Sequence, residues 1–527
     1  MPKAKGKRQS SPFPWWRLRR ISQWSFLAFY FILFILTAYK GTDEIAYPVR
    51  IFLHFDPLIL ITTFLSSHII PLALLLSLIT VAFTLVFGRV FCGWVCPLGT
   101  LNDFMGRLTP QERRKKHVGD RARRVKYYGL VFILISSLFT FQIAGLADPI
   151  SLLIRSLAVA VEPTINLMTH TVFDLLYRAN IPVVTAISEA IYGVLKKYVL
   201  AFHQPFFYQG IFTGLIFVGI LLANLYRRRF WCTALCPLGA LLGLITQISP
   251  FKRAVGKGCT SCNLCVRECR TGAAADVKGK WKKAECVMCG ECQEDCPEDV
   301  VRFGFIPSQT GKVAGVDLGR RGVIASLVSG IFIVPLMRTN PLTQRRTGRL
   351  IRPPGALPEN EFLRRCVRCG ECMKVCLTNG LQPALFEAGL EGIWTPRFDF
   401  HSGYCQYYCT LCGQVCPTGA LRELSQEEKA RTKIGLAYID KNRCIPYAQG
   451  VECLVCEEHC PTPDKAIKFE QVVIMTPQGR KRIRQPVIDL KLCIGCGICE
   501  YKCPLHEQPA IIVTRLGESR AGELLPF

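Results

Sequence analysis

The chain has 527 residues, half of them hydrophobic, and carries 65 Lys and Arg against 39 Asp and Glu. This length allows several domains, and the 28 cysteines recur at short spacings that fit metal binding rather than a secreted disulfide scaffold. The chain has no CxxCH sequence and only eight histidines, which argues against haem.

The formal net charge of +26 is concentrated beside apolar segments. Seven Lys and Arg and no acid lie in the first 20 residues, and ten more Lys and Arg lie between residues 89 and 126. Basic clusters of this kind hold loops on the cytoplasmic side of a membrane, against anionic lipid. We therefore expect membrane lipid, and no nucleic acid, as the partner of this charge.

Four mostly apolar segments of about 20 residues are long enough to cross a bilayer, at 21–39, 69–87, 127–146 and 206–226. The segments 40–67 and 148–205 are poor in Lys and Arg, so the positive-inside rule places the N-terminus in the cytoplasm. The first apolar segment lacks a small-residue cleavage site and should stay as an anchor. Residues 150–200 mix apolar stretches with charges and prolines, which predicts amphipathic helices on the outer membrane face.

The membrane part repeats internally. Each half has a helix, an Asp-Pro segment (FDPLILI or ADPISLLI), a second helix and a CxxxCPLG sequence (FCGWVCPLG or WCTALCPLG). Two repeats of one orientation imply a pseudo-two-fold axis along the membrane normal, which would bring the two CxxxCPLG sequences together at the cytoplasmic surface. This predicts one site made of Cys92, Cys96, Cys232 and Cys236. Alternatively, these cysteines only pack the helix ends.

Beyond residue 250, two cysteine quartets follow C-x2-C-x2-C-x3-C, the spacing of bacterial two-cluster ferredoxins. In such ferredoxins the fourth cysteine of each quartet ligates the other cluster. One predicted [4Fe-4S] cluster is therefore held by Cys259, Cys262, Cys265 and Cys296, and the second by Cys269, Cys286, Cys289 and Cys292. Zinc is the competing cofactor, but a zinc knuckle needs only cysteine pairs.

Two further pairs of quartets follow, each with a wider first gap in one quartet. The crossover rule predicts four more clusters, held by Cys366, Cys369, Cys372 and Cys416; by Cys376, Cys405, Cys409 and Cys412; by Cys444, Cys453, Cys456 and Cys503; and by Cys460, Cys493, Cys496 and Cys499. Six ferredoxin-type clusters use 24 cysteines and the membrane-end site uses the other four. Seven clusters would therefore account for all 28 cysteines.

These motifs resemble known families. FCGWVCPLG and WCTALCPLG on a four-helix membrane unit, followed by CTSCNLCVREC and CVMCGECQEDCP, resemble the NapH-type membrane subunit of quinol dehydrogenases and the NosR-type polyferredoxins. RRGVIASL, FLRRCVRCGECMKVC, YCTLCGQVCPTGAL and CIGCGICEYKCP resemble the NapG/MauM-type ferredoxin. The chain thus looks like two partners fused in one polypeptide. The resemblance implies quinol oxidation and electron delivery to a periplasmic acceptor.

The resemblance also implies a twin-arginine export signal at Arg320 and Arg321, before the apolar run 323–337. We therefore expect a short fifth helix that carries the four-cluster domain outward, while the first ferredoxin pair stays inside. The alternative is an interfacial helix, because the run is short and is followed by arginines, which oppose the positive-inside rule. These are Arg338, Arg345, Arg346, Arg349 and Arg352.

A quinone site would need proton acceptors near a cluster. Asp56 and Asp148, each followed by Pro, hold matching repeat positions at outer helix ends, and an ionisable group near a bilayer is a functional candidate. Asp-Pro is also a common helix start in which Asp caps the amides, and we favour that role over proton transfer. The two aspartates are expected at the membrane face opposite Cys92 and Cys232.

The predicted fold is a membrane α-helical domain of four to five spans in two tandem repeats, followed by α+β ferredoxin domains. The ranges are 1–250 for the membrane domain, 251–310 for a 2[4Fe-4S] domain, 311–360 for a linker with the fifth helix, and 361–527 for a four-cluster domain. The predicted function is electron transfer in a bacterial or archaeal cytoplasmic membrane, between the quinone pool and a redox partner. That partner is another subunit of a respiratory complex or a periplasmic acceptor. The alternatives are a non-catalytic relay subunit and a redox-sensing or assembly factor, although a sensor needs only one or two clusters.

Overall fold

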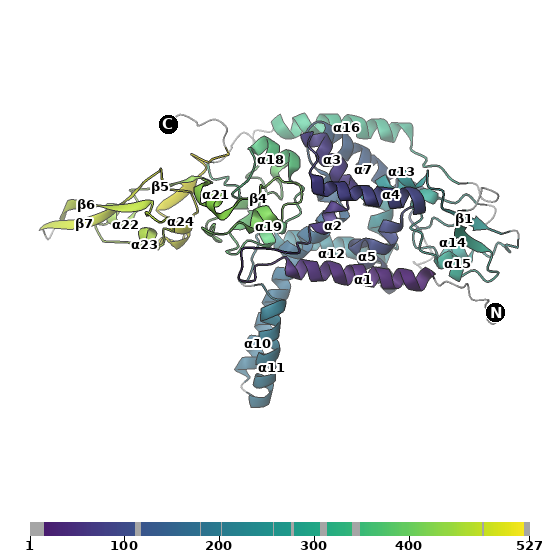
Figure 1. The fold of residues 1–527 in the computed structure, drawn as a ribbon, viewed down its shortest axis with the longest axis horizontal. Helices are drawn as coiled ribbons and strands as arrows, with labels where there is room; N and C mark the ends of the chain where they lie inside the picture. Colours follow the sequence, from purple (N-terminus) through teal and green to yellow (C-terminus); the bar gives the residue numbers. More distant parts are fainter. Residues whose placement is uncertain are drawn as a thin grey trace. The chain divides into compact units, whose positions relative to one another are not determined.

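The structure is a computed structural model that describes residues 15–110, 117–179, 181–201, 203–256, 258–275, 279–305, 313–339, 348–476 and 479–520 (Figure 1). The basic residues before Trp15, and Arg345 and Arg346, lie outside these ranges. The chain forms two compact units. Unit 1 comprises Met1–Leu33, Ile51–Leu153 and Leu215–Ile333, and unit 2 comprises Phe34–Arg50, Ile154–Gly214 and Val334–Phe527.

Most of unit 1 is helical, and its helices follow each other in two similar series. The first series is α1 (Trp15–Leu36), α2 (Ile51–His54), α3 (Pro57–Ser67), η1 (Leu72–Leu76), α4 (Ser77–Phe87), η2 (Phe91–Val95) and α5 (Pro97–Leu108). The second is α7 (Asp120–Leu138), α8 (Ala144–Ala147), α9 (Pro149–Ser156), α12 (Gly210–Tyr226), η4 (Trp231–Leu235) and α13 (Pro237–Thr246). Both series end in a short helix that contains the first cysteine of a CxxxCPLG sequence and a longer helix that begins at its proline.

The two CxxxCPLG segments have the same local structure. In each, a five-residue π-helix ends at the second cysteine, and the proline occupies the first position of the next α-helix. Proline suits this position because its missing N–H would have no partner in the helix. The sulfur of the second cysteine caps the helix, since Cys96 Sγ accepts from the Gly99 amide at 3.4 Å and Cys236 Sγ from the Gly239 amide at 3.3 Å.

Unit 1 also contains the first ferredoxin-like segment. Strand β1 (Lys252–Val255) pairs antiparallel with β2 (Val301–Gly304), with Lys252 opposite Gly304. Between them lie α14 (Leu264–Glu268), η5 (Lys283–Glu285) and α15 (Glu291–Glu294). Ala273, Trp281, Cys286 and Met288 form a small buried core under these elements.

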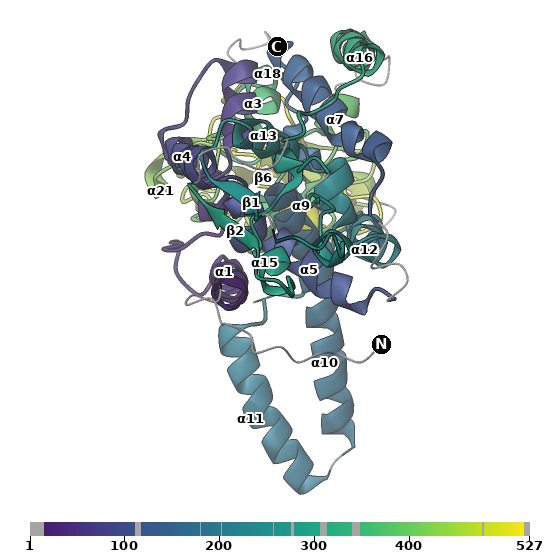
Figure 2. The ribbon, with the colours of Figure 1, turned by 90° about the vertical axis from the view of Figure 1, so that its right-hand side faces the viewer.

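Unit 2 includes the helical segments between α9 and α12. The π-helix η3 (Leu157–Val161) continues α9 into α10 (Glu162–Arg178), and α11 (Pro182–Tyr198) returns as the second arm of a helical hairpin (Figure 2). His170 Nδ1 and the Tyr192 hydroxyl, 2.8 Å apart, link the two arms.

The rest of unit 2 is the cysteine-rich C-terminal part, which follows α16 (Arg320–Thr339). Its short helices are α18 (Glu359–Arg365), α19 (Glu371–Lys374), η6 (Leu390–Gly392), α20 (Leu411–Gln414), α21 (Gln426–Arg431), α22 (Ile445–Ala448), α23 (Val455–Glu458) and α24 (Ile498–Lys502). Three antiparallel strand pairs join them: β3 (Leu381–Pro383) with β4 (Pro396–Phe398), β5 (Leu436–Ile439) with β8 (Ile511–Thr514), and β6 (Ile467–Thr476) with β7 (Gly479–Ile488). Short helices and two-stranded sheets agree with the predicted α+β ferredoxin architecture.

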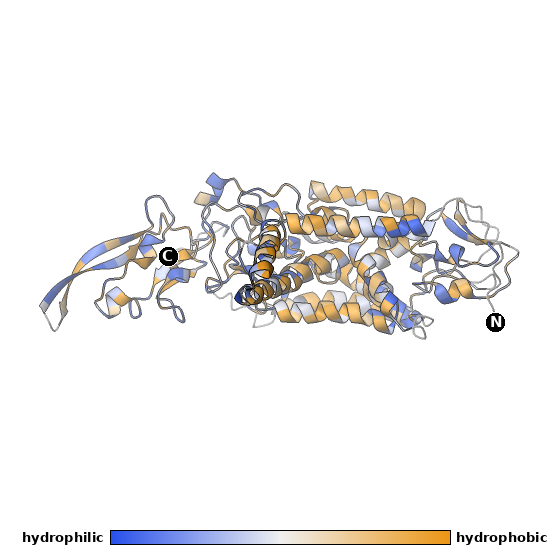
Figure 3. Cartoon of the chain, turned by 90° about the horizontal axis from the view of Figure 1, so that it is seen from below, coloured by the Kyte–Doolittle hydropathy of each residue, from blue (hydrophilic) through white to orange (hydrophobic). Residues whose placement is uncertain are grey.

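Three helices in the described ranges are long and apolar enough to cross a membrane: Trp15–Leu36, Pro149–Arg178 and Arg320–Met337. Hydrophobic residues, orange in Figure 3, dominate the helical part of the chain, whereas much of the β6–β7 strand pair is blue. The predicted spans at 69–87 and 206–226 correspond to the shorter apolar helices Leu72–Phe87 and Gly210–Tyr226. Residues 149–178 differ from the expected amphipathic helices, because they form one continuous apolar helix of 30 residues. The count of four to five spans stays a prediction.

Candidate cluster-binding sites

Four cavities in the described part of the chain are each lined by four cysteines, three from one motif and one from its partner motif. The four sets are Cys259, Cys262, Cys265 and Cys296; Cys376, Cys405, Cys409 and Cys412; Cys444, Cys453, Cys456 and Cys503; and Cys460, Cys493, Cys496 and Cys499. These are the groupings that the crossover rule predicts. The short helix after the second cysteine turns the chain, so that the third and fourth cysteines face different cavities.

The other two crossover sets also come together. Cys286 and Cys292 interact electrostatically with Cys269, and Cys369 and Cys372 interact with Cys416. Burial, with a smaller contribution from neighbouring cysteines, raises the pKa of the Cys286 thiol to about 12. A buried thiol of this kind holds its proton until a metal displaces it, so loading of the site would release protons.

Each of the four cavities has four cysteine thiols in its lining, the number of ligands that one cubane takes. Sulfur ligands of one zinc ion all lie about 2.3 Å from the metal. In the ranges that the structure describes, no three His, Cys, Asp or Glu side chains converge so closely. Four thiols around a cavity fit a cubane, whose iron atoms each take one sulfur ligand at a different corner.

The two CxxxCPLG segments come together in unit 1. Cys96 interacts electrostatically with Cys92 and Cys232, and Cys236 interacts with all three of the others. The two π-helical turns have equal length and end close to one another. Four thiols from segments about 140 residues apart therefore surround one location. Asn102 Nδ2 lies 3.8 Å from Cys232 Sγ and is a further polar contact to this site.

The membrane-end site lies directly against the first ferredoxin-like segment. The Trp94 indole donates to the Met288 carbonyl at 3.1 Å, and Arg89 Nη1 donates to the Ala284 carbonyl at 2.8 Å. The contact is so close that a Cβ added to Gly93 would lie 2.3 Å from the Val287 carbonyl oxygen. The set of Cys286, Cys289 and Cys292 is therefore the immediate neighbour of the membrane-end cysteines.

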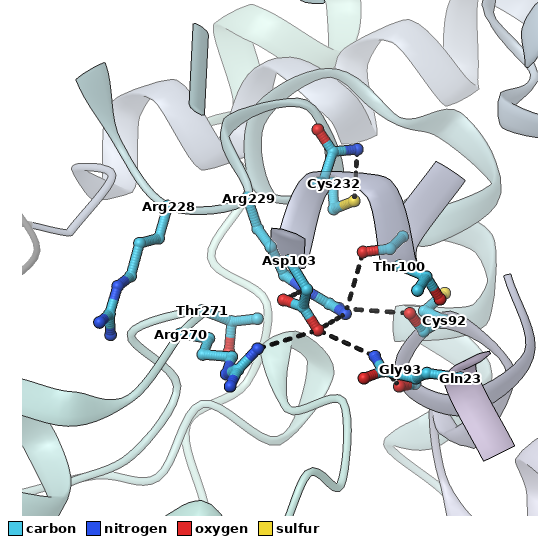
Figure 4. A network of polar contacts seen from close by, with 12 residues as sticks. Gln23, Cys92, Gly93, Thr100, Asp103, Arg228, Arg229, Cys232, Arg270 and Thr271 are labelled. Carbon is cyan, nitrogen blue, oxygen red and sulfur yellow. Dashed lines mark hydrogen bonds and ion pairs between the residues drawn. The ribbon is translucent and has the colours of Figure 1, made fainter. Parts of the chain in front are cut away.

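Asp103 and Arg229 form the centre of a buried ionic network beside this site (Figure 4). Arg229 donates from Nε and Nη2 to the two Asp103 carboxylate oxygens at 2.6 and 2.7 Å, and from Nη1 to the Cys92 carbonyl at 3.2 Å. Arg270 lies 3.1 Å from the same carboxylate, and Gln23 donates to it at 2.9 Å. Burial opposes ionisation of Asp103, but Arg229 and Arg270 outweigh it and hold the pKa of this carboxyl well below its usual range.

The network extends to the ferredoxin-like segment through Glu291, which lies between Cys289 and Cys292. Arg270 Nε donates to Glu291 at 2.6 Å, and Arg19 donates to it at 2.9 Å. Arg270 stands where four of the other five quartets have Pro after the fourth cysteine; Leu377 is the other exception. This departure from the motif therefore supplies a cation that ties the ferredoxin-like segment to Asp103.

Arg89 holds the position in the first CxxxCPLG segment that Arg229 holds in the second, three residues before the first cysteine. Its Nη2 lies 3.8 Å from Cys92 Sγ, and its Nη1 lies 3.8 Å from Glu285, which also pairs with Lys126 at 2.5 Å. A Cβ at Gly239 would lie 2.8 Å from Arg89 Nη2, so glycine leaves the space that this guanidinium occupies. Both arginines are buried. The sequence reasoning missed them, although the R-x2-C-x3-C-P-L-G pattern shared by both segments would have revealed them.

The structure brings Asp56 and Asp148 together in unit 1. Asp56 caps α3 by accepting from the Leu58 and Ile59 amides, and Asp148 caps α9 by accepting from the Ile150 and Ser151 amides. Both aspartates therefore cap helices, and the preference for this role over proton transfer stays a prediction. Both carboxyl groups are fully buried and lie close enough to interact electrostatically. Their pairing was not foreseen, because it joins the two repeats.

Comparison with known proteins agrees with these sites. A 4Fe-4S binding domain matches residues 69–116, 209–257 and 412–436, a 4Fe-4S dicluster domain matches 365–420, and a second 4Fe-4S binding domain matches 486–506. The first of these domains matches both CxxxCPLG segments separately.

Curated relatives each match part of the chain. The ferredoxin-type protein NapG of Escherichia coli is 40% identical over 185 residues, which cover 34% of this chain and 77% of NapG. The methylamine utilization ferredoxin-type protein MauM of Methylorubrum extorquens is 34% identical over 203 residues, 38% of this chain and 88% of MauM. The putative electron transport protein YccM of E. coli is 26% identical over 233 residues, 44% of this chain and 55% of YccM. No solved structure shows a significant match.

Proposed function

The chain belongs to the family of NapG- and MauM-type multi-cluster ferredoxins, and we propose that it oxidises quinol at a membrane and passes the electrons to a redox partner. The coarse role, iron–sulfur electron transfer, follows from the family and the 4Fe-4S domains. We further propose a fused membrane part of NapH/NosR type, seven clusters and the quinone pool as the electron source. The domain ranges and the 28 cysteine ligands predicted above belong to this proposal.

The observation that carries the proposal is the order of the cysteine sets. In unit 2, Cys372 interacts with Cys412, Cys405 donates its amide to the Cys496 carbonyl at 2.8 Å, and Cys499 interacts with Cys456. Each contact joins one set to the next, which supports a linear series of four sites. In unit 1 the membrane-end cysteines adjoin the set of Cys286. Clusters bound at these positions would supply one-electron transfer between neighbours.

Membrane topology is the second component of the proposal. Arg19, near the start of α1, pairs with Glu291 in the first ferredoxin-like segment. Asp43, in the segment that follows α1, accepts from the Thr410 amide in the four-cluster part at 2.9 Å. We propose that α1 crosses the cytoplasmic membrane, with the first ferredoxin pair inside and the four-cluster domain outside. The helix Arg320–Met337 would be the fifth span, which carries the chain outward.

The test is reduction of the clusters by a menaquinol analogue in purified, anaerobic protein. We expect quinol to bleach the iron–sulfur absorbance and to produce the EPR signals of reduced clusters. If dithionite reduces the clusters and quinol does not, the protein is a relay that receives electrons from a separate quinone-binding subunit.

The aspartate pair has its own arm in the same assay. Asp56→Asn and Asp148→Asn should keep the quinol-driven rate, because an amide can still accept from the helix amides and donate to the remaining carboxylate. A large loss of rate with full iron content in either variant would show that these aspartates take part in quinol oxidation.

A further inference from the structure

Unit 2 contains a fifth cavity, which differs from the four described above because Cys376 is its single lining cysteine. Its open volume, which includes space continuous with solvent, is about 500 Å³. Its walls come from four places: the segment after α1, the junction of η3 and α10, residues 373–379, and a segment that contributes Ala201, His203, Pro205 and Phe207.

The lining of this cavity is mostly apolar, with a few polar groups. Apolar side chains come from Ala38, Ala158, Ala201, Pro205, Phe207 and Leu377. Tyr39, Glu162, His203, Lys374 and Asn379 add polar atoms. Such a lining suits a flat ring that carries hydroxyl groups at its edge, since the walls exclude water and the polar groups fix the orientation.

The polar groups are held in place. Lys374 Nζ donates to both Glu162 carboxylate oxygens at 2.6 and 2.7 Å, and its side chain is 1% exposed. The same ammonium lies 4.0 Å from the centre of the Phe34 ring. Asn379 donates to the Phe206 carbonyl at 2.7 Å. Each Glu162 oxygen keeps a lone pair that can accept a further hydrogen bond.

The cavity also touches a redox site and an apolar helix. Cys376 lines both this cavity and the one shared with Cys405, Cys409 and Cys412. Ala38 follows α1, and Glu162 lies within the apolar helix Pro149–Arg178. Both helices are long enough to cross a membrane. With α1 crossing the membrane as proposed above, a lipid-soluble molecule would reach the cavity from the bilayer and contact a cluster ligand.

We propose that this cavity binds the quinol, an inference that rests on the proposed function and assigns its substrate site. The two O–H bonds of the quinol break, and the protons pass to the Glu162 carboxylate and the His203 imidazole. The two electrons leave one at a time through Cys376 to oxidised clusters of this chain. The product is the quinone, so atoms and electrons balance.

The experiment uses the full-length protein with its clusters, labelled with an azidoquinone under light and mapped by peptide mass spectrometry. We expect the label in residues 201–207 or 373–379, displaced by excess quinone and unaffected by phospholipid. Ala201→Trp and Ala38→Trp, both at half-buried lining positions, should lower labelling and the quinol-driven rate at least tenfold. Ala179→Trp, at an exposed position after α10, is the matched control and should change neither.

A further variant tests the proton acceptor. Glu162→Gln should keep the labelling and slow quinol-driven reduction, because the ring still fits and one proton acceptor is lost. Iron content and reduction by dithionite must stay at the wild-type level in every variant that is compared.

The possible failures are distinguishable. If quinol reduces the wild type but the label lies elsewhere, or phospholipid displaces it, the site assignment is overturned and the proposed function stands. The same holds if both tryptophan variants keep full labelling and rate. If the wild type is labelled in the cavity but quinol never reduces its clusters, the cavity binds quinone and the proposed function fails. An unchanged rate in Glu162→Gln overturns the role of this carboxylate as acceptor.

Discussion

Arg89 should raise the reduction potential of a cluster at the membrane-end cysteines. Its guanidinium is buried, and Nη2 lies 3.8 Å from Cys92 Sγ. A fixed positive charge favours the reduced cluster, which carries one more negative charge. Replacing Arg89 by Gln removes this charge and keeps a side chain that can donate to the Ala284 carbonyl. The potential of this cluster should therefore become more negative.

The magnitude follows from Coulomb's law. With the added electron about 7 Å from the guanidinium and an effective dielectric constant of about 20, the interaction is about 2.4 kcal/mol. For a one-electron couple this corresponds to roughly 100 mV, because a tenfold change in equilibrium constant is about 59 mV. Glu285 lies 3.8 Å from Arg89, and its pairing with Lys126 keeps it neutralised in the variant. The predicted shift is thus on the order of −100 mV.

The measurement is an EPR-monitored redox titration of purified protein. The signal of interest is the one that disappears in Cys92→Ser. Arg227→Gln is the matched control, since this half-buried arginine stacks on the Tyr226 ring at 4.4 Å. A shift below about 20 mV, or a positive shift, would refute the electrostatic reasoning. An equal shift in the Arg227→Gln control would show that the charge of Arg89 beside the cysteines does not cause the change in reduction potential.

The remaining predictions concern content, topology and pH. Intact anaerobic protein should contain about 28 iron atoms per chain, and Cys92→Ser should lose one cluster and keep six, whereas about 24 iron in both would rule out the membrane-end site. A reporter fused after Phe527 should read periplasmic and one placed near residue 310 cytoplasmic; two cytoplasmic readings would mean that the fifth helix does not cross. Burial opposes ionisation of Glu359, but Arg352 and Arg520 outweigh burial and lower the pKa of this carboxyl from 4.5 to about 2. The ionised Glu359 therefore stabilises the folded protein fully above pH 4.5, and this stabilisation is lost as the pH falls towards 2. Glu359→Gln should therefore destabilise the four-cluster domain by up to about 3 kcal/mol near pH 7 in denaturant unfolding, and a difference that does not shrink with acid would contradict this.

Spacing alone predicted how the ferredoxin cysteines group, because three cysteines two residues apart must share one turn of chain. The C-terminal part was identified from its motifs, and its kinship with NapG and MauM is confirmed. Grouping by crossover is a property of adjacent motifs, so local sequence is sufficient to find it.

Contacts between residues far apart in the sequence could not be predicted from local motifs. Asp103, Arg229 and Arg270 come from distant segments, and nothing in the local sequence of any one of them indicates the other two. Asp56 and Asp148 each look like an ordinary helix cap, and only the packing of two series of helices makes the two carboxyl groups neighbours. The cavity beside Cys376 likewise needs four separate segments.

The continuous helix at 149–178 was not predicted for a different reason. Its charged residues and prolines interrupt the apolar stretches, and this mixture predicted amphipathic helices. Glu162 is compensated by Lys374, and Pro163 lies in the first turn of α10. Because the charge has a partner and the proline directly follows a π-helical turn, one continuous helix forms.

The distance in sequence between the two halves of the membrane-end site has a consequence for biosynthesis. Cys92 and Cys96 leave the ribosome before Cys232 and Cys236 exist, and the chain between them takes roughly 7 to 28 s to make at about 5 to 20 residues per second. Throughout that interval one dithiol half-site is without its other half, so that copper or zinc could occupy it and an oxidant could join its thiols. The sulfur cap of Cys96 on the Gly99 amide already orients one thiol during this wait. Cluster insertion at this site must therefore follow translation of both halves, whereas each ferredoxin motif pair can be loaded within seconds of emerging.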